Sequence, residues 1–278
     1  MSARSSAAAR APAATAAPIV LREDVGGITL LSLNRPQGRN ALSEAMLDAL
    51  LQSFAAIASD RKVRAVVLAA EGPAFSAGHD LKEITAHRND PDGGRAYVRQ
   101  IMETCSRLMQ NIMDLPQPVI AAVEGTATAA GCQLVATCDL AIASETARFC
   151  TPGVQIGLFC STPMVALSRN VATKHALEML LTGDTISADE ACRIGLVNRV
   201  VPAGSEREEA LRLARKLAAK SALTVKMGKQ AFYWQRDMSV ADAYRYATEV
   251  MVENMMARDA EEGIGAFIEK RAPTWEDR

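Results

Sequence analysis

Apolar positions follow two different spacings along this chain, and the change between them divides the sequence into two parts. In the first two-thirds, short apolar runs predict strands of a buried sheet. These runs lie at residues 28–33, 65–69, 119–123 and 140–143. Helical spacing over residues 43–59, with Ser43 as a plausible N-cap, separates the first two runs. Strands that alternate with helices indicate βαβ units and a largely parallel sheet.

From about Thr162 onward the spacing becomes helical, apart from a short strand signal at residues 197–201. The predicted helices cover residues 174–181, 187–194, 206–219, 240–256 and 260–270. We therefore expect an α/β core domain at residues 19–205, followed by a C-terminal helical region at residues 206–278. No linker signal separates the two, so the helices pack on the core or on a neighbouring subunit.

The first 18 residues differ in composition from the rest, being rich in Ala, Ser and Pro, with arginines and no acidic residue. Organellar transit peptides share this bias. The prolines would interrupt an amphipathic helix, which favours a disordered tail. We therefore expect a tail at residues 1–18 and a cytoplasmic protein, with organellar targeting as the alternative.

Charge and motif content exclude several classes of function. The chain has 31 basic and 32 acidic residues, so no net positive field attracts nucleic acid. No apolar run approaches the roughly 18 residues of a membrane span. The six cysteines form no CxxC pair, which favours reduced thiols, and three histidines supply a metal site poorly. Phosphate-loop, Rossmann, zinc-protease and serine-hydrolase motifs are absent from the sequence.

Two loops rich in small residues each follow a predicted strand. The first, GPAFSAGHDLK at residues 72–82, contains Ser76, Ala77 and Gly78, which leave backbone N–H groups open to a ligand. Its alternative interpretation is a tight turn that needs Gly78.

The second loop belongs to TAAGCQLVATCDL, residues 128–140. Residues 129–132 should form the first turn of a helix, whose unpaired N–H groups attract negative charge. The alternative is a close helix-to-helix contact that requires small residues. Together, the two loops could point one N–H each at a single oxygen and form an oxyanion hole.

At this point the chain resembles the enoyl-CoA hydratase/isomerase, or crotonase, superfamily. The resemblance lies in LNRPQGRNALS (33–43), AFSAGHDLKE (74–83), AAVEGTATAAGCQLVATCDLAIAS (121–144), FCTPGVQIGLF (149–159), ISADEACRIGLVNRVV (186–201) and EEGIGAFIEKR (261–271). It implies the α/β crotonase (ClpP/crotonase-like) fold, a spiral of βαβ units with a helical C-terminal trimerisation region. It also implies acyl-CoA thioester substrates, a homotrimer or dimer of trimers, and no cofactor beyond the coenzyme A of the substrate.

Position by position, the resemblance also implies site residues. The oxyanion hole would use the N–H groups of Ala77 and Ala130, with Gly131 beside the latter. Contacts to the substrate and its coenzyme A part would come from Gln37, Arg39, Ser76, His79, Asp80, Leu81, Lys82 and, in a neighbouring subunit, Phe267 and Lys270.

The chain departs from the hydratase pattern at two positions. Hydratases of this superfamily carry glutamates where this sequence has Gln133 and Gly153. An amide has no proton that titrates in the useful range, and positioned acid–base groups contribute roughly 10²–10⁴-fold each. We therefore expect weak hydration. The stretches GCQLVA, CTPGV and IGLFCSTP most resemble the subgroup called enoyl-CoA hydratase domain-containing protein 3, a name given by homology.

Three interpretations remain open from the sequence. The chain is an enzyme of acyl-CoA or fatty-acid metabolism that moves protons by another group, for which His79 and Asp80 are the nearest titratable residues. Alternatively, it binds acyl-CoA without turnover, as a binding or regulatory homologue. Thirdly, a small anion such as bicarbonate replaces the carboxylate beside Gly153, as the resemblance to naphthoate-synthase members with glycine there allows.

Overall fold

The computed structural model describes residues 17–278. The tail predicted at residues 1–18 therefore lies almost entirely outside the described residues. Within the described range, no helix is both long enough and apolar enough to cross a membrane.

A six-stranded sheet forms the centre of the fold, with the strand order β1-β2-β3-β4-β6-β9. Strand β1 is antiparallel to β2, and the other neighbours are parallel. A smaller sheet has the order β5-β7-β8. The strands are β1 Val20–Val25, β2 Ile28–Leu33, β3 Ala65–Ala70, β4 Val119–Val123, β5 Thr126–Thr128, β6 Leu140–Ser144, β7 Arg148–Cys150, β8 Ile186–Ser187 and β9 Arg199–Val201.

Helices connect successive parallel strands, as the βαβ prediction requires. The helices are α1 Glu44–Ser59, α2 Leu81–Ala86, α3 Arg95–Asp114, α4 Ala130–Thr137, α5 Ser161–Asn170, α6 Thr173–Thr182, α7 Ala188–Arg193, α8 Glu206–Ala218, α9 Ala222–Gln235, α10 Val240–Met255 and α11 Arg258–Glu269. Short 3₁₀ turns occupy Pro36–Gly38, His87–Asn89 and Pro152–Ile156.

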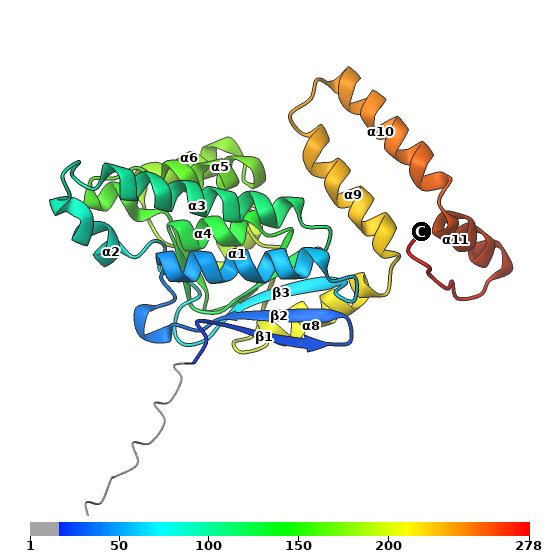
Figure 1. The fold of residues 1–278 in the computed structure, drawn as a ribbon, viewed down its shortest axis with the longest axis horizontal. Helices are drawn as coiled ribbons and strands as arrows, with labels where there is room; N and C mark the ends of the chain where they lie inside the picture. Colours follow the sequence, from blue (N-terminus) through cyan, green and yellow to red (C-terminus); the bar gives the residue numbers. More distant parts are fainter. Residues whose placement is uncertain (1–16) are drawn as a thin grey trace, which may run out of the picture.

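Both faces of the main sheet are covered, and the strand sequences explain why. In β3, Val66 and Leu68 belong to one buried cluster, whereas Ala65, Val67 and Ala69 belong to another on the opposite face. A strand buried on both sides needs a continuous apolar run. The first cluster packs against α1, α3 and α4, and the second packs against α8, which lies on the other side of the sheet (Figure 1).

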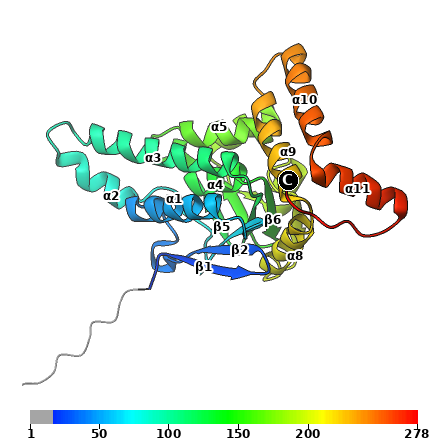
Figure 2. The same ribbon diagram turned by 45° about the vertical axis from the view of Figure 1, so that its right-hand side comes forward.

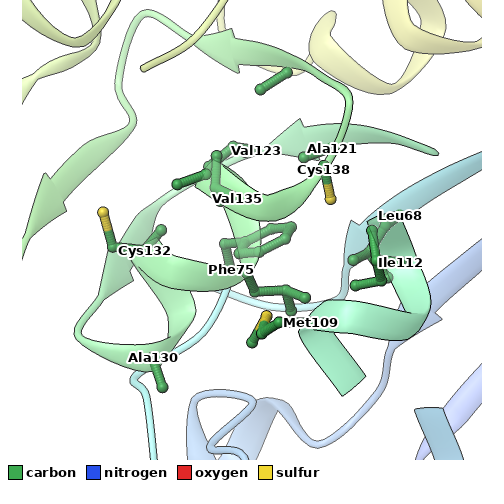
Figure 3. Close-up of a cluster of buried hydrophobic side chains, with 14 of the residues drawn as sticks. Leu68, Phe75, Met109, Ile112, Ala121, Val123, Ala130, Cys132, Val135 and Cys138 are labelled. Atoms are coloured by element: carbon green, nitrogen blue, oxygen red, sulfur yellow. The ribbon is translucent and has the colours of Figure 1, made fainter. Parts of the chain in front are cut away.

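The larger cluster fixes the loops that follow β3 and β4. Phe75, from the loop after β3, is fully buried among Met109 of α3, Val135 of α4 and Val123 of β4 (Figure 3). Burying an aromatic ring of this size contributes about 1.5–3 kcal/mol. Because Phe75 directly precedes Ser76, this burial also holds the first small-residue loop against the core.

The boundary between the core and the C-terminal helical region lies later in the chain than the sequence predicted. Helix α8 packs on β3, β4 and β6 with Ala210 and Ala214 buried, so the chain after residue 206 still belongs to the core. Helices α9 to α11 then extend away from the sheet (Figures 1 and 2). The helical region that projects from the core thus begins at Ala222 rather than at residue 206.

Candidate functional site

The two small-residue loops touch each other at the carboxyl ends of β3 and β4. A Cβ built on Gly78 would lie 3.0 Å from the Cβ of Ala129 and 3.2 Å from the nitrogen of Ala130. A Cβ on Gly131 would lie 2.3 Å from the carbonyl oxygen of Ser76. The missing side chains therefore serve close packing between the two loops, whereas the alternative interpretation placed the contact between two helices. They also leave backbone groups open.

Hydrogen bonds in the first loop decide which N–H groups remain available. The N–H of Ala77 donates to the carbonyl of Arg39 at 3.0 Å, and the N–H of Gly78 lies 3.3 Å from the Ser76 hydroxyl oxygen. In the described part of the chain, the N–H of His79 donates to no acceptor. The expectation that Ala77 supplies the free donor is thus wrong for this structure, because that N–H is already engaged.

The second loop presents the start of α4. Ala129 precedes this helix with φ 52° and ψ −119°, a region that a residue with a Cβ rarely adopts. Its own N–H donates to the carbonyl of Cys150 at 2.9 Å, which holds the turn. The N–H groups of Ala130 and Gly131 belong to the first turn of the helix and have no intrahelical acceptor. The strained turn orients these two donors.

A cavity of about 480 Å³ lies between the two loops and the segment that follows β7. Its wall includes Ala77, His79, Leu81, Ile84, Met102, Thr128, Ala129, Ala130, Pro152, Gly153, Gln155, Ile156, Leu158, Phe159, Cys160, Ser161, Thr162 and Pro163. Among the described residues, His79 and Cys160 are the only titratable side chains in this wall. A mostly apolar cavity with a few polar groups is typical of a site for a small, largely apolar ligand.

Burial disfavours the charged form of both titratable side chains in the wall. Burial lowers the pKa of His79 below its ordinary value of 6.5, despite a nearby Leu42 backbone group that opposes the shift. Both ring nitrogens of His79 are buried, and neither has a hydrogen-bond partner within residues 17–278. Burial raises the pKa of Cys160. The site therefore holds a neutral imidazole and a thiol, not a charged pair.

Two other residues of the first loop, Asp80 and Ser76, use their polar groups in contacts within the protein. Asp80 caps α2 by accepting from the N–H groups of Lys82 and Glu83, and it pairs with Arg35 at 2.9 Å. Burial tends to raise the pKa of Asp80, but these hydrogen bonds outweigh it, so the pKa is lowered. Ser76 is fully buried and its hydroxyl donates to the carbonyl of Asn40 at 2.8 Å. Neither side chain points a free polar group into the cavity wall.

The two positions that lack glutamate differ in their surroundings. Gln133 lies in α4, is 4% exposed, and is absent from the cavity wall; its Oε1 has no partner among the described residues. Gly153 does line the cavity. A Cβ there would lie 2.9 Å from the carbonyl oxygen of Leu158 and 3.0 Å from Sγ of Cys160. A carbonyl oxygen repels an anion, so the structure gives no support to bicarbonate beside Gly153.

Residues expected on the coenzyme A side fall into two groups. Arg39 is exposed and lines a second cavity of about 310 Å³, which shares Ala77 and Thr128 with the first. Gln37 and Lys82 are also exposed, on the segments just before α1 and at the start of α2. Leu81 lines the main cavity.

Phe267 and Lys270 are not brought to this site within one chain. Both lie at the end of α11, on the opposite side of the molecule from α2, and Phe267 is 84% exposed (Figure 1). Their proposed contact with a ligand therefore requires a neighbouring subunit.

Sequence reasoning missed most of the apolar wall. Met102 belongs to α3, a helix that was not predicted. Ile156, Leu158 and Phe159 belong to residues 149–159, where the sequence indicated only a resemblance to the family. Their one signal was an apolar run, VQIGLF, interrupted by glycine where a strand or helix would continue. Among residues 17–278, no three His, Cys, Asp or Glu side chains are grouped to hold a metal ion.

Comparison with known proteins identifies the family of this chain. The family model described as "Enoyl-CoA hydratase/isomerase" matches residues 23–278. The chain therefore belongs to the enoyl-CoA hydratase/isomerase family and has the crotonase fold, as its sequence stretches indicated.

Individual relatives indicate which subgroup of the family this chain resembles. The mitochondrial enoyl-CoA hydratase domain-containing protein 3 of Homo sapiens is 49% identical over 90% of this chain and 80% of its own length. Its crystal structure superposes with a TM-score of 0.88 at 47% identity, over 92% of this chain and 100% of that one. An enoyl-CoA hydratase structure from Mycobacterium smegmatis gives a TM-score of 0.88 at 52% identity, over 93% and 99% of the two chains. The predicted resemblance to this subgroup is confirmed.

Proposed function

We propose that this protein binds acyl-CoA thioesters with the thioester oxygen between the N–H groups of His79 and Ala130. The observation that carries the proposal is the junction of the two loops. A Cβ built on Gly78, the residue before His79, would lie 3.2 Å from the nitrogen of Ala130. Both donors are free of protein acceptors in the described chain, and both residues line the apolar cavity. Two such donors stabilise an enolate or tetrahedral oxyanion.

The same site supports weak hydration rather than efficient hydration. Adding water across a double bond uses positioned acid and base groups, and this wall offers one neutral imidazole and one thiol. Proton transfer would therefore depend on His79, on water or on the substrate itself. Asp80 is a poor candidate because its carboxylate is committed to Arg35 and the α2 cap.

A second candidate function is acyl-CoA binding without turnover. It is favoured by the same scarcity of titratable groups in the cavity wall. Loss of the chemistry would leave the loops and the apolar cavity intact, because these depend on packing. Measurable binding with no turnover over a broad panel of thioesters would support this candidate, and robust turnover of any thioester would exclude it.

The test of the proposed function is the steady-state kcat/KM for hydration of crotonyl-CoA, measured together with its affinity. We expect binding with a rate near background. A value of roughly 10⁶ M⁻¹s⁻¹ or above, in the upper part of the usual range, would mean that another group supplies the protons. Absence of binding by every acyl-CoA tested would contradict the proposal itself.

The relatives also bear on the compartment. The names of the frog, rat and human proteins include the word mitochondrial, which supports the organellar alternative over the cytoplasmic expectation. We propose that residues 1–18 act as a targeting segment. Fusing these residues to a fluorescent protein and measuring import into isolated mitochondria tests this, with a fusion whose arginines are replaced as the control.

A further inference from the structure

We propose that the acyl group is a straight, uncharged chain of about eight carbons or more, and that Ile156, Leu158 and Phe159 cover its far end. The inference rests on the proposed function and specifies the class of thioester that the same cavity accepts.

The size of the cavity is the first argument. A water-sized group occupies about 30 Å³, and the cavity measures about 480 Å³. At that volume per carbon, a four-carbon acyl group would fill about a quarter of the space and an eight-carbon chain about half of it. Unfilled apolar space forfeits contacts on its walls, so a short chain gains little of the available binding free energy.

Exposed apolar side chains in the cavity wall are the second argument. Leu81 is 50% exposed, Ile156 61%, Leu158 53% and Phe159 42%, and all four line this one cavity. Single exposed apolar residues are common, but a group that lines one cavity marks a surface that a ligand covers. An acyl chain that continues from the loops along the cavity would cover these side chains.

The position of the covering segment gives the chain its direction. His79 and Ala130 both line the cavity, and the proposed function places the thioester between their N–H groups. Ile156 ends the 3₁₀ turn after β7, and Gly157 then reverses the chain at φ 76°, which brings Leu158 and Phe159 to the wall. An acyl chain that begins between these two N–H groups and reaches this segment lies along the apolar lining.

The cavity lining also disfavours an acyl chain that ends in a charged group. No Asp, Glu, Lys or Arg side chain from residues 17–278 lines the cavity, so a terminal carboxylate would be buried without a cationic partner. Ser161 and Thr162, in the first turn of α5, also line the cavity, and the start of a helix favours an anion. Binding of a carboxylate there is the competing outcome, and the experiment must separate the two.

Titration calorimetry with free coenzyme A and the saturated butyryl, hexanoyl, octanoyl, decanoyl and dodecanoyl thioesters tests the chain length. We expect the affinity to rise about two- to fourfold per methylene up to octanoyl at least. Equal affinity, within twofold, from butyryl to dodecanoyl would overturn the inference while leaving the proposed function intact. If none of these thioesters binds, the proposed function fails as well.

A matched thioester and three variants test the charge and the covering residues. An eight-carbon chain ending in a carboxylate should bind at least tenfold more weakly than octanoyl-CoA; equal or tighter binding would overturn the inference. Phe159→Ser and Ile156→Ser should weaken dodecanoyl binding several-fold and change butyryl binding less than twofold. Val25→Ser, which alters a 60% exposed side chain of β1, should change neither. Unchanged dodecanoyl binding in both cavity variants would remove these residues from the assignment.

Discussion

At the scale of single residues, Gly131 allows the two loops of the site to meet. Its Cβ position is 2.3 Å from the carbonyl oxygen of Ser76, and that carbonyl is fixed because it accepts from the N–H of Thr128 at 3.0 Å. Gly131→Ala should therefore destabilise the protein by about 3 kcal/mol and weaken acyl-CoA binding at least tenfold. Chemical denaturation and calorimetry measure the two effects.

The same substitution in an open position supplies the control. A Cβ on Gly228, inside α9, meets nothing within 4 Å. Gly228→Ala should leave binding unchanged and raise stability by up to about 1 kcal/mol, because alanine favours a helix. A mild effect of Gly131→Ala, comparable to that of the control, would show that the two loops can separate without cost.

His79 should make stability depend on pH. Burial lowers its pKa below 6.5, whereas in the unfolded chain it titrates near 6.5. Below pH 6.5 the unfolded state therefore binds more protons, so stability falls as pH drops from 6.5 toward the folded pKa and is unaffected above this window. Asp80 stays ionised throughout, because its pKa is lowered from 3.8.

Replacing the imidazole should remove this contribution. In His79→Gln, unfolding free energy measured at pH 7.5, 6.5, 5.5 and 5.0 should fall less steeply below pH 6.5 than in the parent protein. His175→Gln, at a histidine on α6, is the matched control for the loss of an imidazole elsewhere in the chain. Identical slopes in all three proteins would mean that His79 titrates normally.

Residue identity revealed the small loops, but it could not show which N–H groups were free. Ala77 matched the expected position, yet its N–H donates to Arg39, a residue 38 positions earlier in the chain. Such a pairing depends on how η1, the Pro36–Gly38 turn, packs against the loop, and no local pattern encodes it. The same holds for Cys160, which approaches Gly153 only after the chain turns at Gly157.

At the scale of elements, the strongly periodic segments were predicted well. Strands β2, β3, β4 and β6 and helix α1 agree with the sequence to within a residue, and the Ser43 hydroxyl accepts from Met46 N–H as an N-cap. Strands β5, β7 and β8 were missed because they have only two or three residues each. Their pairing, not their composition, makes them strands, and β5 positions Thr128 in the cavity wall.

One buried ion pair attaches the projecting helix α9 to the core. Lys229 Nζ lies 2.7 Å from Asp139, and it also donates to the carbonyls of Ile112 and Gln117. Tyr233 of the same helix donates to Asp139 at 2.9 Å. The Lys229 side chain is only 7% exposed, so this network is largely removed from water.

Breaking this pair should loosen α9. Lys229→Met leaves the buried Asp139 without its cation and should destabilise the protein by about 3–5 kcal/mol. Lys226→Met, one turn earlier on the exposed face of α9, should change stability by less than about 0.5 kcal/mol. Urea denaturation followed by circular dichroism measures both, and equal stability of the two variants would contradict an anchoring role.

At the scale of the whole molecule, α9 to α11 form an arm that extends from a fully packed core (Figure 2). None of the residues in α9 or α10 is fully buried. On α10, Val240, Tyr244, Met251 and Met255 recur at helical spacing and are 75%, 74%, 61% and 53% exposed. An apolar stripe of this length is a surface that another protein surface covers. We propose that the partner is a second copy of this chain, in a trimer or a dimer of trimers.

Charge placed on this stripe should prevent assembly. The parent protein should sediment with three or six times the mass of one chain, and the double variant Tyr244→Glu/Met251→Glu should sediment as a single chain, because two carboxylates would be buried unpaired in the interface. Val25→Glu, on exposed β1, should keep the parent mass. The dissociated variant should also bind acyl-CoA about tenfold more weakly, since Phe267 and Lys270 can reach a ligand only from a neighbouring subunit. A parent protein that sediments as one chain, or a double variant that keeps both its mass and its affinity, would show that the arm does not form the interface.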